Sequence, residues 1–282
     1  MTKTWLITGA SSGFGRGMAE RLLARGDQVI ATVRRQGSLD DLAAQYHDRL
    51  RVVYLDVTDT DGVQAAVNQA FADFKRIDVI VSNAGYGILG TVEETSIDQM
   101  RDIIETNLMG SMVLIKAALP HLRAQGFGRI VQVSSEGGQI AYPGFSLYHA
   151  SKWGIEGFIE SLAKEVQPFD IYFMIVEPGP SRTAFVGSIV LPDPIRDYDG
   201  TPAHDLKDAA FGGGGVIKGD PDRMVDAMIT AADAPVMPFR LLLGKDAYAG
   251  VHGALSERLA VLEAGRDVAE AADFTEEELA AM

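Results

Sequence analysis

Seven short apolar runs, separated by longer amphipathic stretches, limit the fold of this chain more than any other feature. The candidate strands are residues 3–8, 27–33, 50–55, 78–82, 129–134, 171–176 and 239–243. In the stretches between them, such as residues 59–74, apolar residues recur at the 3.6-residue period of a helix. Strands that alternate with such helices form a parallel sheet covered on both faces. We therefore predict one doubly wound α/β domain over residues 1–282.

Three regions depart from this regular alternation. Residues 97–123 read as one long helix, bent around Gly110. Residues 181–220 contain several prolines and the run Gly212 to Gly215 with little periodicity, and such a long irregular segment is typical of a lid over a substrate site. Residues 245–282 are predicted to form a C-terminal helical extension.

A glycine-rich turn follows the first candidate strand. Gly9, Gly13 and Gly15 lie between that strand and a helical pattern. Glycines allow the backbone to approach a pyrophosphate closely, and the N-terminus of the helix supplies unpaired N–H donors. The turn therefore predicts a dinucleotide site, although a glycine-rich turn without a ligand is the alternative.

The end of the second candidate strand distinguishes between two dinucleotides. An acidic residue there would bind a ribose 2′-hydroxyl, whereas an arginine suits a 2′-phosphate. This strand ends in Arg34 and Arg35 and has no acid at its tip. We therefore expect NADP(H) rather than NAD(H), unless both arginines are simply solvated.

Tyr148 and Lys152 form a candidate catalytic pair. They lie four positions apart at the start of a predicted helix, so both side chains lie on the same face. A nearby ammonium group favours the phenolate and would lower the pKa of the tyrosine towards the range of a general acid or base. On its own this pair is weak evidence, because the same spacing occurs by chance on many helices.

Taken together, these residues and several others resemble the short-chain dehydrogenase/reductase family, whose fold is a Rossmann-type domain. The matching elements are Thr8-Gly9-Ala10-Ser11-Ser12-Gly13-Phe14-Gly15, Asp56-Val57, Asn83-Ala84-Gly85, Asn107, Ser135, Tyr148-x-x-x-Lys152, Pro178-Gly179 and Thr183. They occur in the family's order over residues 3–183, whereas the last hundred residues match only loosely.

The resemblance implies a role for each matching residue. Four would be catalytic: Tyr148 as general acid or base, Lys152 as the group that lowers its pKa, Ser135 on the substrate oxygen and Asn107 in a water chain. The implied cofactor-binding residues are Gly9, Ser11, Ser12, Gly13, Phe14, Gly15, Arg34, Arg35, Asp56, Val57, Asn83, Ala84, Gly85, Tyr148, Lys152, Pro178, Gly179 and Thr183. Ser134 is an alternative to Ser135, and we interpret His149 as structural.

The favoured function is NADPH-dependent reduction of a ketone or aldehyde, reversible as alcohol oxidation. Residues 179–185 and 31–34 look like the subgroup of 17β-hydroxysteroid and retinol dehydrogenases, which favours a hydrophobic small-molecule substrate. One alternative is a 3-oxoacyl-carrier-protein reductase, although those enzymes look shorter. A second is a nucleotide-sensing protein without catalysis, although the Ser, Tyr and Lys set is intact.

Charge and composition narrow the possible partners. A net charge of -14 disfavours binding to nucleic acid or to an anionic membrane. No run looks long enough to span a bilayer, cysteine is absent, and the histidines lack metal-ligand spacing. We therefore expect a cytoplasmic protein without a metal. The family resemblance suggests a homodimer or homotetramer built on the helices at 97–123 and 148–166.

Overall fold

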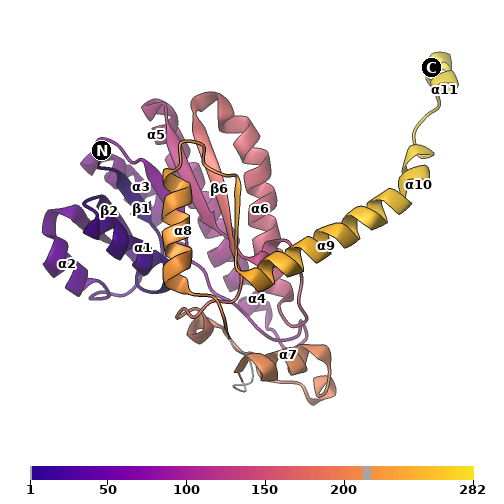
Figure 1. Cartoon of the computed structure of the whole chain (residues 1–282), viewed down its shortest axis with the longest axis horizontal. Helices are drawn as coiled ribbons and strands as arrows, with labels where there is room; N and C mark the ends of the chain where they lie inside the picture. Colours follow the sequence, from indigo (N-terminus) through magenta and orange to yellow (C-terminus); the bar gives the residue numbers. More distant parts are fainter. Residues whose placement is uncertain (1, 212–216) are drawn as a thin grey trace.

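The computed structural model describes residues 2–211 and 217–282 and is built on one seven-stranded parallel sheet (Figure 1). The sheet order is β3-β2-β1-β4-β5-β6-β7, and β1 pairs with both β2 and β4. The strands are β1 (Thr4–Ile7), β2 (Gln28–Val33), β3 (Leu50–Tyr54), β4 (Val79–Ser82), β5 (Gly128–Val133), β6 (Ile171–Pro178) and β7 (Arg240–Leu243). The predicted Rossmann-type fold is confirmed.

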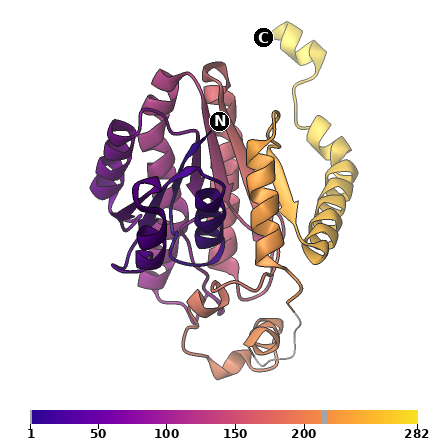
Figure 2. The ribbon, with the colours of Figure 1, turned by 60° about the vertical axis from the view of Figure 1, so that its left-hand side comes forward.

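Helices cover both faces of the sheet (Figure 2). The helices are α1 (Gly13–Ala24), α2 (Asp40–Tyr46), α3 (Thr60–Asp73), α4 (Ile97–Ile104), α5 (Gly110–Gln125), α6 (Ser146–Val166), α7 (Pro202–Phe211), α8 (Pro221–Asp233), α9 (Lys245–Ala264), α10 (Arg266–Glu270) and α11 (Glu276–Ala281). Alternate strand residues point to opposite faces. Trp5 and Ile7 therefore pack with α1, α2 and α8, whereas Leu6 packs with α3, α5 and α6.

The predicted helix at 97–123 is divided by a π-helical turn. This turn, Glu105–Met109, separates α4 from α5 and places the irregularity just before Gly110. The stretch Ile97–Gln125, with a mean hydropathy of 1.2, is long and apolar enough to cross a membrane. The expectation that no run of the sequence is long enough to span a bilayer was therefore wrong. The buried residues of this stretch, including Leu114 and Ile115, pack against the sheet, so its length is weak evidence for a membrane.

The segment after β6 is more regular than its sequence suggests. It contains two 3₁₀ turns, Val186–Ser188 and Arg196–Tyr198, and the helix α7. The first position of α7 is Pro202, which is compatible with a helix start because this position needs no N–H donor. The run Gly212 to Gly215 lies outside the described residues.

The C-terminal extension consists of three helices rather than one. Its first helix, α9, projects away from the sheet and its helical layers (Figure 1). Gly265 separates α9 from α10, and Thr275 begins α11 with a capping box. Apolar side chains such as Leu259 and Leu262 are exposed on α9.

A buried ionic cluster joins α6 to the last two strands. Arg240 of β7 forms ion pairs with Glu156 of α6 (2.6 Å) and with Glu177 of β6. Burial raises the pKa of Glu177 to about 7, with a further increase from Glu156 and an opposing effect of Arg240. Two carboxylates within one buried cluster depend on the guanidinium for compensation.

We expect Arg240→Met to lower the free energy of unfolding by about 3 kcal/mol at pH 8, because it leaves two buried carboxylates without their cation. The loss should be smaller at pH 5.5, since a group with a raised pKa stabilises the fold only while it is protonated. Urea denaturation at both pH values measures this. Arg101→Met, at an exposed position of α4, should change stability by less than about 0.5 kcal/mol. An equal loss in the two variants would contradict the role of the cluster.

Candidate active site

A cavity of about 610 Å³ opens at the carboxyl ends of the strands. The loops after the first six strands, β1 to β6, form its walls together with the start of α6. The predicted site residues that line it are Gly9, Ser11, Ser12, Gly13, Phe14, Arg34, Asp56, Val57, Asn83, Ala84, Gly85, Ser135, Tyr148, Lys152, Pro178, Gly179 and Thr183. The fold thus brings together residues that are up to 174 positions apart in the chain. Gly15, Arg35 and Asn107 are not among the lining residues.

The glycine-rich turn leaves space and hydrogen-bond donors for an anion. Gly9 has a φ of +66°, and a Cβ on Gly15 would lie only 2.6 Å from the Asn83 amide nitrogen. Ser12, the N-cap of α1, makes no side-chain cap bond, and the first turn of α1 contains no acidic residue. Backbone N–H groups and the positive end of the helix dipole therefore face the cavity, and they fit a pyrophosphate.

Arg34 and Arg35 differ in position although both are exposed. Arg34 lines the cavity. The pKa of the nearby Asp56 is lowered, mainly by a hydrogen bond from the Thr58 N–H group and to a smaller extent by the charge of Arg34. Within residues 2–211 and 217–282, the Arg34 guanidinium forms no ion pair with a carboxylate. Arg34 is therefore placed to meet an anionic group at the end of β2, and Arg35 is not.

Tyr148 lies deep in the cavity, at the start of α6. Its ring is held between Phe145 and Phe185, with centroid distances of 5.9 Å to each. Burial raises the pKa of Tyr148 to about 12; the Ser135 side chain lowers it in part and the Glu136 carboxylate raises it. The phenol is consequently a proton donor over the whole neutral range. Its pKa differs from the lowered value expected from the sequence, because burial outweighs other influences in the protein alone.

Lys152 follows Tyr148 on the same face of α6, as the spacing predicts. Its Nζ lies 5.6 Å from the centre of the Tyr148 ring and donates a hydrogen bond to the Val133 carbonyl (3.1 Å). Burial lowers the pKa of Lys152 to about 8. The amine can therefore gain or lose a proton near neutral pH.

The structure distinguishes the two adjacent serines. Successive residues of an extended chain point to opposite sides. Ser134 donates a hydrogen bond to Glu156 of α6 (2.5 Å), away from Tyr148. The Ser135 side chain interacts with Tyr148 and also accepts a hydrogen bond from the Gly137 N–H group (3.0 Å). Ser135 is therefore the serine that can meet a substrate oxygen beside Tyr148.

Asn107 lies behind the cavity wall, inside the π-helical turn. Its amide group donates to the Tyr86 carbonyl (2.8 Å) and accepts from the Tyr86 N–H group (3.0 Å). It also donates to Ser151 of α6 (3.2 Å). These contacts fix the loop after β4 against α6, so the side chain positions the site rather than lining it. The π-helical turn directs this residue inwards, as such turns often do at functional sites.

His149 has a structural environment, in line with the interpretation of the sequence. Its Nε2 accepts a hydrogen bond from the Tyr142 N–H group (2.8 Å), so Nδ1 carries the proton and donates to the Gly137 carbonyl (2.8 Å). Burial lowers the pKa of His149. The neutral ring therefore holds the loop after Ser135 in place.

Comparison with known proteins identifies the family. The family model described as short chain dehydrogenase matches residues 3–192. The chain belongs to this family. It is 40% identical to "Oxidoreductase BOA17" of Botryotinia fuckeliana, over 89% of this chain and 92% of that protein. It is also 37% identical to human "17-beta-hydroxysteroid dehydrogenase type 1", over 71% of this chain and 62% of that protein.

Solved structures resemble this short-chain dehydrogenase over most of its length. One from Streptomyces avermitilis is 39% identical, with a TM-score of 0.89 over 96% of this chain and 98% of the other. A Burkholderia cenocepacia relative in complex with NADP is 25% identical, with a TM-score of 0.73 over 92% of this chain and 95% of the other. The family binds nicotinamide cofactors, and this chain is an oxidoreductase that acts on CH–OH and C=O groups.

Sequence reasoning predicted a hydrophobic substrate and a lid over its site, but it did not identify the side chains that form the apolar half of the dehydrogenase's cavity. Phe145, Phe185, Ile189 and Leu206 line it, three of them in the predicted lid segment. Phe185 ends the stretch 179–185 that resembles the subgroup, whereas the other three belong to no motif, because they come from irregular loops and a short helix. The only signal in the sequence for an apolar cavity wall was the presence of aromatic and aliphatic residues close to the motif residues.

The lid segment is anchored by a buried carboxylate, Glu94, whose side chain is 1% exposed. Glu94 accepts hydrogen bonds from the Ile195 N–H group (2.9 Å), the Thr91 N–H group (2.7 Å) and the His204 ring (2.6 Å). Burial alone would raise the pKa of Glu94, but these donors lower it to about 2. The Glu94 carboxylate in turn raises the pKa of His204, to which Asp199 also contributes.

We expect the anchoring of the lid to weaken as pH rises. A histidine with a raised pKa gives its full stabilisation below its unfolded pKa of about 6.5, and loses it as pH rises through the folded value. Trypsin should therefore cut the segment 181–211 more slowly in the wild type than in His204→Gln at pH 6. At pH 9 the two rates should converge. A ratio of rates that does not change with pH would show that the His204 charge has no such role.

Proposed function

We propose that this short-chain dehydrogenase reduces a hydrophobic ketone or aldehyde with NADPH and oxidises the corresponding alcohol in reverse. The observation that carries the proposal is the meeting of Ser135, Tyr148 and Lys152 in one cavity with the glycine-rich turn. A nucleotide-sensing protein without catalysis would not need a buried phenol beside a serine and an amine. The intact set therefore favours an enzyme.

The mechanism follows from the positions of these side chains. The nicotinamide, when bound, supplies the hydride to the carbonyl carbon. Ser135 and Tyr148 donate hydrogen bonds to the carbonyl oxygen and stabilise the negative charge that develops there. Tyr148 then gives its proton to that oxygen. Lys152, whose amine titrates near neutral pH, is positioned to return a proton towards Tyr148, while Asn107 holds the neighbouring backbone.

The pKa of Tyr148 supports reduction as the favoured direction. Because burial holds the phenol protonated up to a pKa of about 12, the group is ready to donate at neutral pH. Alcohol oxidation needs the phenolate instead. A positive nicotinamide ring beside the phenol would lower its pKa and so assist that direction.

NADPH is proposed as the cofactor because of Arg34. A guanidinium matches the geometry of a phosphate group, and Arg34 lines the cavity at the end of β2. The backbone N–H group and the hydroxyl of Ser11, which also lines the cavity, would add donors for the 2′-phosphate. No acidic residue stands at the tip of β2 to favour a free 2′-hydroxyl.

The substrate is proposed to be apolar because Phe145, Phe185, Ile189 and Leu206 surround the space next to Tyr148. The similarity to 17-beta-hydroxysteroid dehydrogenase type 1 agrees with this. A 3-oxoacyl-carrier-protein reductase is less well supported, because those enzymes look shorter and this chain carries both the segment with α7 and the C-terminal helices that begin with α9.

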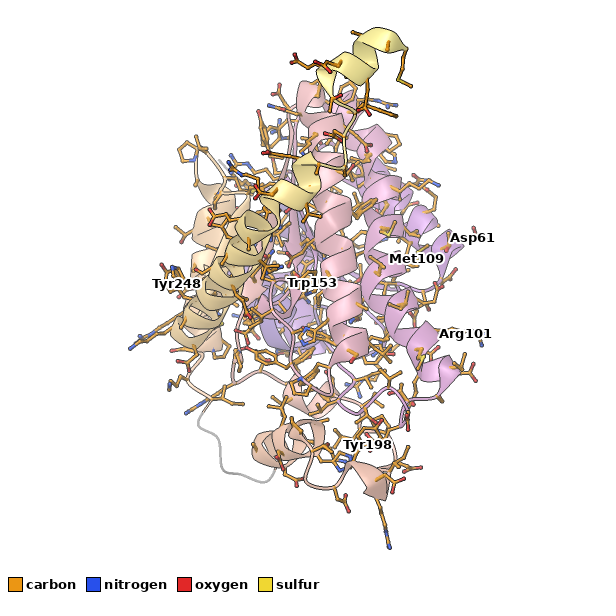
Figure 3. All side chains as sticks on the ribbon, turned by 90° about the vertical axis from the view of Figure 1, so that its right-hand side faces the viewer. Asp61, Arg101, Met109, Trp153, Tyr198 and Tyr248 are labelled. Atoms are coloured by element: carbon orange, nitrogen blue, oxygen red, sulfur yellow. The ribbon has the colours of Figure 1, made fainter. Side chains whose placement is uncertain are left out.

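A homodimer or homotetramer is proposed as the assembly. Ile97 of α4, Met109 of the π-helical turn and Trp153 of α6 are large apolar residues that remain exposed, and Met109 and Trp153 lie on the same side of the molecule (Figure 3). Exposed apolar residues grouped in this way are typical of subunit interfaces. The cytoplasmic location expected from the sequence stays a prediction.

We expect Tyr148→Phe to lower kcat for ketone reduction by about a hundredfold or more, because the proton donor is lost. NADPH binding, followed by quenching of protein fluorescence, should persist because the glycine-rich turn is unaltered. Tyr172→Phe, at an exposed position of β6, is the matched control and should retain full turnover. Normal turnover by Tyr148→Phe would remove Tyr148 from the mechanism.

We expect Arg34→Asp to lower the ratio of kcat/KM for NADPH over NADH by about tenfold or more, because the charge-assisted bonds to the 2′-phosphate are lost. Arg35→Asp is the control, since Arg35 does not line the cavity and the ratio should stay close to that of the wild type. Equal effects of the two substitutions, or none from Arg34→Asp, would place phosphate recognition elsewhere.

We expect sedimentation analysis to give a dimer or tetramer for the wild type and a smaller species for Met109→Asp, because a carboxylate buried in an apolar interface is strongly unfavourable. Tyr54→Asp, at an exposed position of β3, should leave the assembly intact. A monomeric wild type, or an unchanged assembly in Met109→Asp, would refute an interface on this side of the molecule.

A further inference from the structure

Glu136 is a buried carboxyl group in the cavity wall that the mechanism above does not use. It directly follows Ser135, begins the 3₁₀ turn Glu136–Gly138, and is 5% exposed. A carboxylate buried to this extent is normally paired with a cation. In the part of the chain that the structure describes, Glu136 forms no ion pair. Its one hydrogen bond comes from the Tyr142 hydroxyl to Oε1 and is long, at 3.3 Å.

The second carboxyl oxygen, Oε2, lies beside the cavity-lining residue Gly179. A Cβ placed on Gly179 would be 2.9 Å from the Ala247 Cβ and 3.5 Å from Oε2, so a side chain at this position would contact the oxygen. Oε2 accepts no hydrogen bond from the described residues. It is therefore an acceptor with free capacity inside the cavity.

Glu136 is also close to the reacting groups. Its charge contributes to the raised pKa of Tyr148, which places the two groups within electrostatic range. Ser135, Tyr148 and Glu136 line the same cavity, so a substrate whose oxygen is held by Ser135 also occupies space that Glu136 borders. The raised pKa of Glu136 itself arises from burial, with Tyr142 lowering it and Asp246 raising it.

We propose that Glu136 binds a second polar group of the substrate, a hydroxyl or ammonium donor near the reacting carbonyl. The proposal rests on the proposed carbonyl reductase function and narrows the substrate class to apolar ketones that carry such a donor, of which α-hydroxy and α-ammonio ketones are the simplest. The reaction is unchanged: the carbonyl carbon receives the hydride, its oxygen receives the Tyr148 proton, and NADPH is oxidised. A substrate without the donor leaves Glu136 buried and unpaired, which such sites reject strongly.

The test compares three ketones that share one apolar body: acetophenone, 2-hydroxyacetophenone and the 2-amino analogue as its ammonium salt at pH 6. We expect the wild type with NADPH to prefer at least one of the two donor-bearing ketones by tenfold or more in kcat/KM. In Glu136→Leu, the ratio of kcat/KM for the donor-bearing ketones to that for acetophenone should be close to one. Glu136→Gln should retain part of a preference for the hydroxyl but lose a preference for the ammonium group, which distinguishes the two donors. Glu165→Leu, at an exposed position of α6, is the control and should keep the wild-type ratios.

The outcomes separate this inference from the proposed function. If the wild type turns over the ketones without any preference, or if Glu136→Leu and Glu136→Gln both keep the wild-type ratios, the Glu136 inference is overturned and the reductase function stands. If the wild type reduces none of the ketones, the proposed function fails. Calorimetric binding of the same three ketones to the NADP-loaded wild type and Glu136→Gln then still decides whether Glu136 recognises the donor. Thermal melting of each variant shows that it is folded.

Discussion

The parallel pairing of β1 with β4 is the constraint on which the whole site depends. At this point the order of the strands reverses: β2 and β3 are added on one side of β1, and β4 to β7 on the other. The helix α1 after β1 packs on one face of the sheet, and α5 packs on the opposite face. The two loops diverge and leave a crevice at the carboxyl ends of the strands, where ligands bind in folds of this kind. Asn83 spans the crevice floor by donating hydrogen bonds to the Thr8 and Gly9 carbonyls (2.9 and 3.1 Å).

Burial determines the chemistry at this crevice. Tyr148 and Lys152 share one face of α6 and are both withdrawn from water, and burial disfavours the charged form of each. The pKa values of the two groups, which are ordinarily close to each other, consequently move apart, to about 12 for Tyr148 and about 8 for Lys152. A phenol that stays protonated and an amine that readily exchanges its proton suit a donor that must be refilled after each turnover.

Much of the architecture could be predicted from the sequence, because buried strands and amphipathic helices leave clear periodic patterns. The glycine-rich turn, Ser135, Tyr148 and Lys152 could be assigned to one site, because their order and spacing match a family. Three details were out of reach. The π-helical turn around Asn107 depends on packing against α6, and α7 has too little periodicity to be recognised. The sequence also does not show which of the adjacent Arg34 and Arg35 lines the cavity.

The pKa of Tyr148 was the largest departure from expectation, and it has a simple cause. Helical spacing shows that an amine and a phenol are neighbours, but it does not show how much solvent reaches them. The same limit explains why Glu136 was overlooked: in the sequence it is an ordinary charged residue, and only the structure places it in a cavity wall.

The anchoring of the lid at Glu94 separates the molecule's two recognition tasks. The proposed dinucleotide half is built mainly by the loops after β1, β2, β3 and β4, whereas most of the apolar half comes from the segment after β6, which is attached to Glu94. Substitutions in the lid would therefore change the apolar wall while Ser135, Tyr148 and Lys152, which lie outside the lid, stay the same. Lineages that share this scaffold could acquire new metabolic roles by exchanging one loop, and the same property makes that loop the natural place for directed evolution of new biocatalysts.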